Sequence, residues 1–329
     1  MEERIVRLSL FSTAAAFALV CFLWPHDAYA WGPLAHLEFS RSALSDLSFL
    51  GPALRTLLTN FANEFLYGSL AADIIVGKNL ARYEVHCHNW KIGFRVFDQA
   101  KSDPQRAFSL GFLSHLAVDT IAHNYYVPYK TVQGFRARAS GHAYWELRYD
   151  QRLDPDLWRL ARQVSQKQYR EHDAHLEEVL ADSYVIPFAL SKTMFGSLLL
   201  AARLKKWQRM SEVIAGEREL WLHDEEIGEC RNLAVQNIRD MLKHAQRARC
   251  VEVDPTGERN LHIAGLLRNQ LKARDDLSER QQAEIVRQAR PAFRNGIWGR
   301  LRLPELPDAE PAAKGTSLAD APLPPLVIP

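Results

Sequence analysis

The chain has 329 residues, and its 41 basic and 39 acidic side chains leave a formal charge of only +2. Because this balance is nearly neutral, the composition gives no reason to expect a stable nucleic-acid partner. Four cysteines in a chain of this length exclude a small disulfide-stabilised scaffold, although Cys230 and Cys250 could pair in an oxidising compartment.

The first 30 residues have the features of an export signal. Two arginines precede an apolar stretch from Leu8 to Trp24, and Ala-Tyr-Ala at 28–30 matches an A-x-A cleavage site. An uncleaved membrane anchor is the alternative, because about 17 apolar residues approach the length that spans a bilayer. We prefer cleavage, which makes Trp31 the first residue of a periplasmic or secreted protein.

Downstream of this signal, apolar residues recur at helical spacing, and the alternating pattern of strands is missing. We therefore expect an all-α, multi-helix domain over residues 31–302. Pro104 and Pro155 lie at typical helix starts, and Pro128 is expected to end the helix that carries His123. The expected helical segments are 34–48, 51–71, 89–101, 105–123, 140–150, 156–181, 184–211, 222–248 and 259–292.

The C-terminal end has a different composition. Seven of the 16 prolines lie in the last 26 residues, with few large apolar side chains between them. Such a segment cannot bury enough apolar surface to form a core. We expect residues 303–329 to form an extended or disordered tail.

Metal-binding residue types are concentrated in one part of the chain, where six of the 12 histidines lie between residues 31 and 146. In the segment SHLAVDTIAH, His115, Asp119 and His123 are four residues apart, so on an α-helix they share one stripe. Their neighbours are apolar, and a buried polar group without a partner is costly. A bound cation would satisfy all three side chains. Ordinary hydrogen bonds to neighbouring helices are the alternative.

Further groups of the same kind occur nearby in the sequence. His142 and Glu146 repeat the four-residue spacing on a second expected helix. The apolar segment SLAADII contains Asp73 as an isolated carboxylate, and VHCHNW adds His86 and His88. Imidazole nitrogens and carboxylate oxygens together suit zinc. One zinc ion cannot use them all, so the sequence predicts more than one.

The segments WGPLAH, SLAADII, VHCHNW, AFSLGFLSHLAVDTIAHNYYVP and SGHAYWELRYD occur in this order across residues 31–150. Together they resemble the zinc-dependent phospholipase C family, which shares its fold with fungal-type single-strand-specific zinc nucleases. The resemblance implies the all-α fold of that family and about three Zn²⁺ ions per chain. It also implies that Trp31 binds zinc through its α-amine and carbonyl oxygen, which requires removal of the signal.

The resemblance implies ten metal-site residues: Trp31, His36, Asp73, His86, His88, His115, Asp119, His123, His142 and Glu146. The first zinc would bind Trp31, His36 and one oxygen of Asp119. The third zinc would bind His123, His142 and Glu146. The best-known family members place two more residues between the bridging aspartate and the next histidine.

The second zinc would bind His115, the other oxygen of Asp119, and an imidazole from either His86 or His88. We prefer His88 as the ligand and expect His86 to lie outside the metal coordination. Asp73 lies beside this site in the family, either as a zinc ligand or as the general base of catalysis.

These features predict a secreted phosphodiester hydrolase, with a phospholipid or a membrane surface as its partner. We favour a phospholipase C that releases diacylglycerol and a phosphorylated headgroup from a glycerophospholipid, because closely spaced divalent cations activate hydroxide and stabilise phosphoryl charge. A zinc-dependent single-strand nuclease or another phosphodiesterase is one alternative. A non-catalytic, zinc-stabilised binding protein is the other. The oligomeric state is not predicted.

Overall fold

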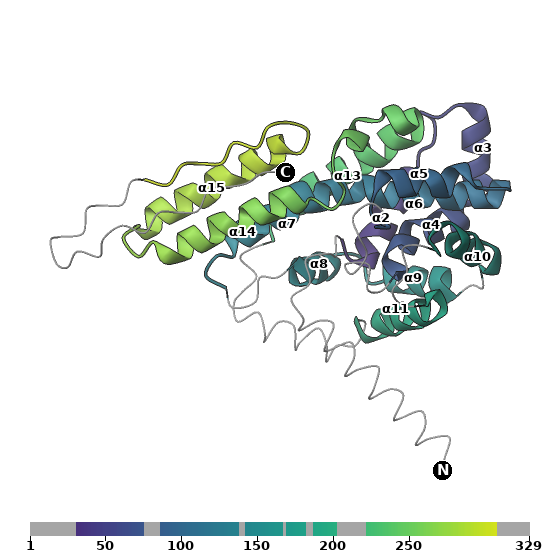
Figure 1. The fold of residues 1–329 in the computed structure, drawn as a ribbon, viewed down its shortest axis with the longest axis horizontal. Helices are drawn as coiled ribbons and strands as arrows, with labels where there is room; N and C mark the ends of the chain where they lie inside the picture. The colour runs from purple at the N-terminus through teal and green to yellow at the C-terminus, as the bar shows by residue number, and fades with distance from the viewer. Residues whose placement is uncertain are drawn as a thin grey trace, which may run out of the picture.

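A computed structural model describes residues 31–75, 86–137, 142–166, 169–181, 187–202 and 222–307. Within these ranges every regular element is helical, which confirms the expected all-α fold (Figure 1). None of the described helices combines the length and the apolar character that crossing a bilayer requires. The expected signal, residues 1–30, lies outside the described residues.

The chain forms its helices in two groups. The first group is α2 (Pro33–Leu44), α3 (Pro52–Asn60), α4 (Ala62–Ala71), η1 (Ala72–Ile74), α5 (Trp90–Asp98), α6 (Asp103–Ile121), η4 (Ala122–Tyr126), α7 (Val127–Gln133) and α8 (His142–Asp150). The second group is α9 (Leu157–Gln166), α10 (Arg170–Val179), α11 (Phe188–Ala202), α13 (Asp224–His244), η7 (Ala245–Arg247), η8 (Arg249–Glu252), α14 (Glu258–Ala273) and α15 (Glu279–Gly296).

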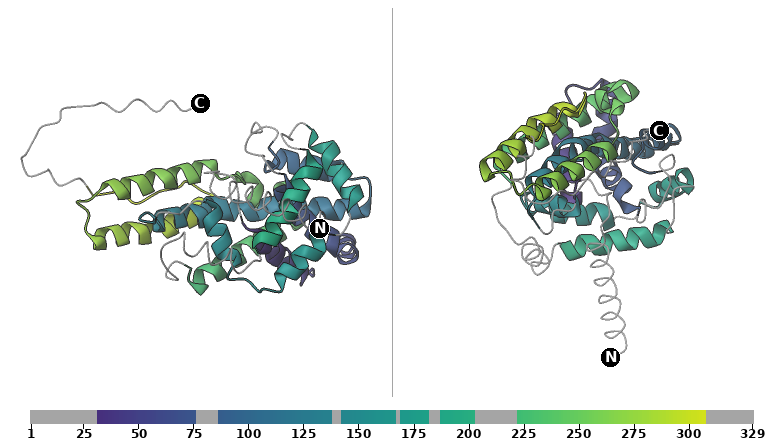
Figure 2. Two further views of the ribbon diagram at one scale, coloured as in Figure 1. Left: turned by 90° about the horizontal axis from the view of Figure 1, so that it is seen from below. Right: turned by 60° about the vertical axis from the view of Figure 1, so that its left-hand side comes forward.

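The central helix of the main body is α6. Every residue from Ala107 to Ile121 is buried, as expected for a helix that is covered on all sides. The Ser102 hydroxyl accepts a hydrogen bond from the backbone N–H of Gln105, and a proline in the first turn favours the helix start. Helices α2, α4, α5 and α13 pack around α6 (Figures 1 and 2).

Two glycines allow α4 and α6 to approach very closely. A Cβ atom at Gly68 would lie 1.9 Å from the carbonyl oxygen of Phe108, and one at Gly111 would lie 2.0 Å from that of Phe65. Any side chain at either position would therefore push the two helices apart. The close crossing brings the backbone of α4 against the face of α6 that carries His115.

Three of the expected helices are each divided in two. The segment 51–71 breaks at Phe61, whose backbone leaves the helical region (φ −122°, ψ 40°), to give α3 and α4. The segment 156–181 forms α9 and α10, and the segment 259–292 forms α14 and α15. Helix α15 begins with a capping box formed by Ser278 and Gln281.

The expectation that Pro128 ends the helix of His123 is wrong. Beyond Ile121 the chain continues as the π-helix η4 and then as α7, and Pro128 lies in the first turn of α7. A proline is tolerated there because a first-turn N–H has no partner within its helix.

Helices α14 and α15 form a hairpin that extends away from the main body beside α7 (Figures 1 and 2). After this hairpin the chain runs back along it, and Leu303 and Leu306 pack against the core. The Arg274 guanidinium donates to the carbonyl oxygen of Pro307 over 2.9 Å. Residues 303–307 of the expected tail are therefore extended and packed, whereas 308–329 lie outside the described residues.

Candidate metal centre

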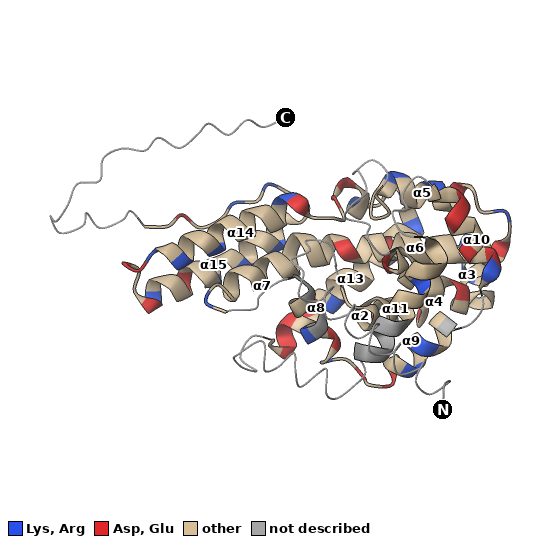
Figure 3. Ribbon diagram, turned by 60° about the horizontal axis from the view of Figure 1, so that its bottom comes forward, with Lys and Arg blue, Asp and Glu red and all other residues tan. Residues whose placement is uncertain are grey.

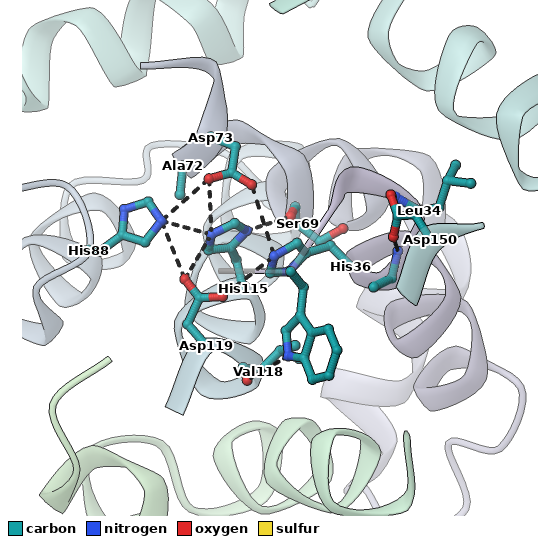
Figure 4. A network of polar contacts seen from close by, with 12 residues as sticks. Leu34, His36, Ser69, Ala72, Asp73, His88, His115, Val118, Asp119 and Asp150 are labelled. Carbon is teal, nitrogen blue, oxygen red and sulfur yellow. Dashed lines mark hydrogen bonds and ion pairs between the residues drawn. The ribbon is translucent and has the colours of Figure 1, made fainter. Parts of the chain in front are cut away.

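Five of the predicted site residues meet beside the second half of α6 (Figure 4). They come from four parts of the chain and are all buried: His36 on α2, Asp73 on η1, His88 before α5, and His115 and Asp119 on α6. The cysteines Cys87, Cys230 and Cys250 are also buried, and none forms a disulfide.

The Asp119 carboxylate lies between three imidazoles. Its Oδ2 atom is 3.2 Å from Nε2 of His115 and 3.3 Å from Nε2 of His88, and its Oδ1 atom is 3.4 Å from Nε2 of His36. Burial acts to raise the pKa of Asp119, but the neighbouring histidines outweigh it and hold the pKa below its usual range. Asp119 is thus an anion, and its Oδ2 atom faces His88 and His115 whereas its Oδ1 atom faces His36.

Asp73 divides its two oxygens in the same way. Its Oδ1 atom is 3.5 Å from Nε2 of His88 and 3.8 Å from Nε2 of His115, and its Oδ2 atom is 3.9 Å from Nε2 of His36. Each carboxylate therefore faces the His88–His115 pair with one oxygen and His36 with the other. This geometry would allow two cations to share Asp119, and it leaves Asp73 placed either to bind a cation or to accept a proton.

The spacing of these atoms fits zinc. Ligands at 2.0–2.1 Å from a tetrahedral zinc ion lie about 3.4 Å from one another. Around the His88–His115 pair, the distances to Asp119 Oδ2 and Asp73 Oδ1 run from 3.2 to 3.8 Å. All four exceed the 2.9–3.0 Å typical of an N–H···O hydrogen bond, so the donor set fits a shared cation better than a set of shared protons.

The His88–His115 pair gives a second reason to place a cation here. The Nε2 atoms of the two rings are 3.0 Å apart. Nδ1 of His115 lies 2.8 Å from the carbonyl oxygen of Ser69, which can only accept, so the ring proton belongs on Nδ1. The Nε2 lone pair of His115 then points into the cluster, which is the arrangement that a metal ligand needs.

The structure separates the two histidines of the VHCHNW segment. His88 shares a possible cation position with Asp73 and His115. His86 instead accepts a hydrogen bond from the backbone N–H of His88 through Nδ1, over 3.1 Å. His86, Cys87 and His88 also place ligand atoms within 4.8 Å of one another, without a carboxylate.

Residues 35–190 match the family model described as zinc dependent phospholipase C. Over these residues the chain is similar to the zinc-dependent phospholipase C family. The match confirms the resemblance found in the sequence, and it includes all five clustered residues. No curated protein and no solved structure gives a significant match to the chain. The family and the His/Asp cluster together support a zinc-dependent hydrolase of the phospholipase C type.

The structure does not test the ligand set predicted for a third zinc, which is His123, His142 and Glu146. His123 lies in η4 with its Nδ1 against the carbonyl oxygen of Pro255, and Glu146 is buried on α8. The His142 side chain lies outside the described residues. Among the described side chains, no group close enough to hold a cation includes His123 or Glu146. The third zinc site stays a prediction.

The side chain of Trp31 is part of the core. Its indole Nε1 donates to the carbonyl oxygen of Val118, next to Asp119, over 3.2 Å. The indole also stacks on Tyr126, with ring centroids 4.6 Å apart. These contacts hold the residue close in space to α6. The predicted role of its α-amine depends on residues outside the described part of the chain.

Sequence reasoning missed Asp150, at the end of α8. Its carboxylate accepts hydrogen bonds from the backbone N–H groups of Leu34 and Ala35 at 3.1 and 3.0 Å, and so caps the helix of His36. A Cβ atom at Gly32 would lie 2.2 Å from this carboxylate, so the position has room only for glycine. Asp150 continues the four-residue spacing of His142 and Glu146, which is the signal that could have identified it.

Proposed function

We propose that this chain is an exported, zinc-dependent phospholipase C that hydrolyses a glycerophospholipid to diacylglycerol and a phosphorylated headgroup. The observation that carries the proposal is the cluster of three imidazoles around two shared carboxylates, within the region that matches the family. Zinc held by these residues would supply Lewis acidity, which lowers the pKa of water so that hydroxide is available as a nucleophile at neutral pH, and its charge would offset that of the phosphoryl group.

The two carboxylates have different surroundings and are suited to different tasks. Asp119 is fully buried, whereas Asp73 retains 7% of its exposure at the edge of the cluster. We assign to Asp119 a permanent negative charge shared by two cations. We assign to Asp73 the acceptance of a proton from the attacking water, because it is the more exposed of the two carboxylates.

The charge distribution favours a lipid over a nucleic acid as substrate. Basic and acidic positions are interspersed along the described helices, α14 and α15 included (Figure 3). A site that follows a phosphate backbone would gather Lys and Arg side chains along one groove. A single phosphodiester within a lipid headgroup does not need such a groove.

The test compares phosphatidylcholine vesicles with single-stranded DNA as substrates of the processed chain. We expect lipid cleavage, with about two or three zinc ions per chain by elemental analysis. Asp73→Asn should keep at least half of the zinc but lose turnover by roughly 100-fold or more, because a general base is removed. The exposed Asp98→Asn is the matched control and should behave as wild type.

Asp119→Asn should lose zinc and turnover together, because a neutral amide replaces the anion that two cations share. Full zinc content with normal turnover in this variant would exclude the bridging role. Cleavage of DNA but not of lipid would make the protein a nuclease. Tight zinc binding without either activity would make it a zinc-stabilised binding protein, and fewer than two zinc ions per chain would count against the centre itself.

A further inference from the structure

Cys87 lies between two parts of the candidate metal centre. Its Sγ atom is 3.2 Å from Nδ1 of His88 and 3.6 Å from the carbonyl oxygen of Ala72, the residue before Asp73. The cysteine is 1% exposed, so water does not compete for these contacts. One thiol thus touches the ring of one predicted ligand and the backbone beside another.

The chemistry of the three groups fixes the direction of these bonds. A carbonyl oxygen can only accept, whereas a thiol has one S–H donor and a sulfur that accepts weakly. The Cys87 proton therefore belongs on the bond to Ala72, and the sulfur faces His88 as an acceptor. Nδ1 of His88 then carries the single proton of the neutral imidazole. Its Nε2 atom keeps a lone pair.

That Nε2 atom is the one that faces the cluster. It lies 3.3 Å from Asp119 Oδ2 and 3.5 Å from Asp73 Oδ1. The bond from His115 Nδ1 to the Ser69 carbonyl oxygen prepares the second ring of the pair in the same way (Figure 4). Metal-binding histidines generally donate their other N–H to an acceptor of this kind. At His88 the acceptor is a thiol.

We propose that Cys87 is a positioning residue, which holds His88 as the Nδ1–H tautomer and so presents Nε2 to zinc. The thiol acts through His88 and touches neither substrate nor metal. The inference rests on the metal centre of the proposed function, but it does not depend on the choice of a lipid as substrate.

The test measures zinc affinity by competition with a chelator in Cys87→Ala, Cys87→Ser and Cys250→Ala. Removing the acceptor in Cys87→Ala should weaken zinc binding by roughly 10- to 100-fold. Serine donates and accepts in the same directions, so Cys87→Ser should recover most of the affinity. Cys250 is an equally buried thiol whose contact is with the backbone of Asn237, so Cys250→Ala should match wild type.

A second measurement uses wild-type protein loaded with zinc and needs no variant. The ¹⁵N chemical shifts of His88 should show zinc at Nε2 and the proton on Nδ1. Placement of the proton on Nε2 would overturn the proposal, as would equal zinc affinities of Cys87→Ala and Cys250→Ala. A sulfur-to-metal charge-transfer band in the Co²⁺-substituted protein, lost in Cys87→Ala, would make the thiol a ligand and also overturn it.

These outcomes separate this proposal from the proposed function. Wild-type protein that binds no zinc would contradict both. Zinc binding that depends on Cys87, in a protein that cleaves no lipid, would support the positioning role and contradict only the phospholipase activity.

Discussion

Trp31 has two separable roles at the level of single residues. Its side chain is 1% exposed and packs within the core, edge-on to Phe39 and stacked on Tyr126. Its backbone is the predicted zinc ligand. A change to the indole and a change to the amino terminus therefore act on different properties of the protein.

We expect Trp31→Ala to lower the free energy of unfolding by about 3–5 kcal/mol, because a large buried aromatic is replaced by a cavity. Adding one residue before Trp31 in the processed chain should leave most of that stability. The extension should lower zinc content more, since a peptide nitrogen has no lone pair available for zinc. Urea unfolding of zinc-free protein and elemental analysis measure the two effects. Greater zinc loss in folded Trp31→Ala would contradict the backbone role.

Asp150 gives a prediction about pH. Burial, together with the nearby Asp73, raises the pKa of Asp150 to about 7, against the two backbone N–H bonds that lower it. In the unfolded chain the pKa is near 3.8. Between pH 3.8 and pH 7, Asp150 therefore holds a proton in the folded state that it has lost in the unfolded state. This group contributes full stability below about pH 4, and the contribution is lost as pH rises to 7.

Zinc-free wild type should therefore lose stability relative to Asp150→Asn between pH 4 and pH 7, by about 4 kcal/mol if the pKa shift is complete. The comparison isolates Asp150 because the histidines titrate in both proteins. Thermal unfolding at several pH values measures the difference. A difference in stability that stays constant over this range would show that Asp150 does not change its protonation on folding.

At the level of elements, α7 and α13 are joined by a buried ion pair between Lys130 and Glu226. The amide oxygen of Gln133 accepts a further hydrogen bond from the ammonium group at 2.8 Å. Burial lowers the pKa of Lys130, although Glu226 acts in the opposite direction. Two buried charges that compensate each other are costly to separate.

Lys130→Met should cost about 3–5 kcal/mol of unfolding free energy, because it leaves the Glu226 carboxylate buried beside an apolar side chain. The double variant with Glu226→Gln should recover at least half of this loss. The exposed pair Lys101–Glu178, at 3.2 Å, is the control, and Lys101→Met should change stability by about 1 kcal/mol or less. Equal losses at both pairs, measured by denaturant unfolding, would contradict this account.

Much of the site could be predicted from the sequence, because side-chain ligands have recognisable types and spacing. His36, Asp73, His88, His115 and Asp119 were all candidates, and the fold brings them together. The acceptors behind the rings could not be predicted in the same way. Any residue supplies a backbone carbonyl like that of Ser69, and the role of Cys87 depends on its distance to Ala72.

The all-α class could also be predicted from the sequence, but the positions where helices break could not. Apolar periodicity continues through Phe61, where only the backbone angles reveal the break. The π-helix η4 arises because the turn that carries His123 is wider than an α-helical turn, and spacing alone does not encode that change. The contact of the His123 Nδ1 atom with the Pro255 carbonyl oxygen could not be predicted from the four-residue spacing either.

At the scale of the whole molecule, the segment after α15 packs against the hydrophobic core and is hydrogen-bonded to the hairpin through Arg274. We expect truncation after Arg302 to lower unfolding free energy by about 2 kcal/mol, because the partly buried Leu303 and Leu306 and the bond to Pro307 are removed. Truncation after Pro307 is the control and should leave stability unchanged. Thermal unfolding of both proteins measures the effect. Equal stability of the two truncated proteins would show that this segment adds nothing.

The glycine crossing of α4 and α6 has a consequence for hydrogen exchange. Because the Gly68 and Gly111 backbones touch without side chains between them, the two helices cannot separate by rotamer changes alone. Their amides should then exchange with deuterium only when the whole core opens, whereas amides on the solvent face of α14 and α15 exchange through local fluctuations. The deuteration rate of α6 would thus report global stability, and its slowing by added zinc would measure the free energy of metal binding.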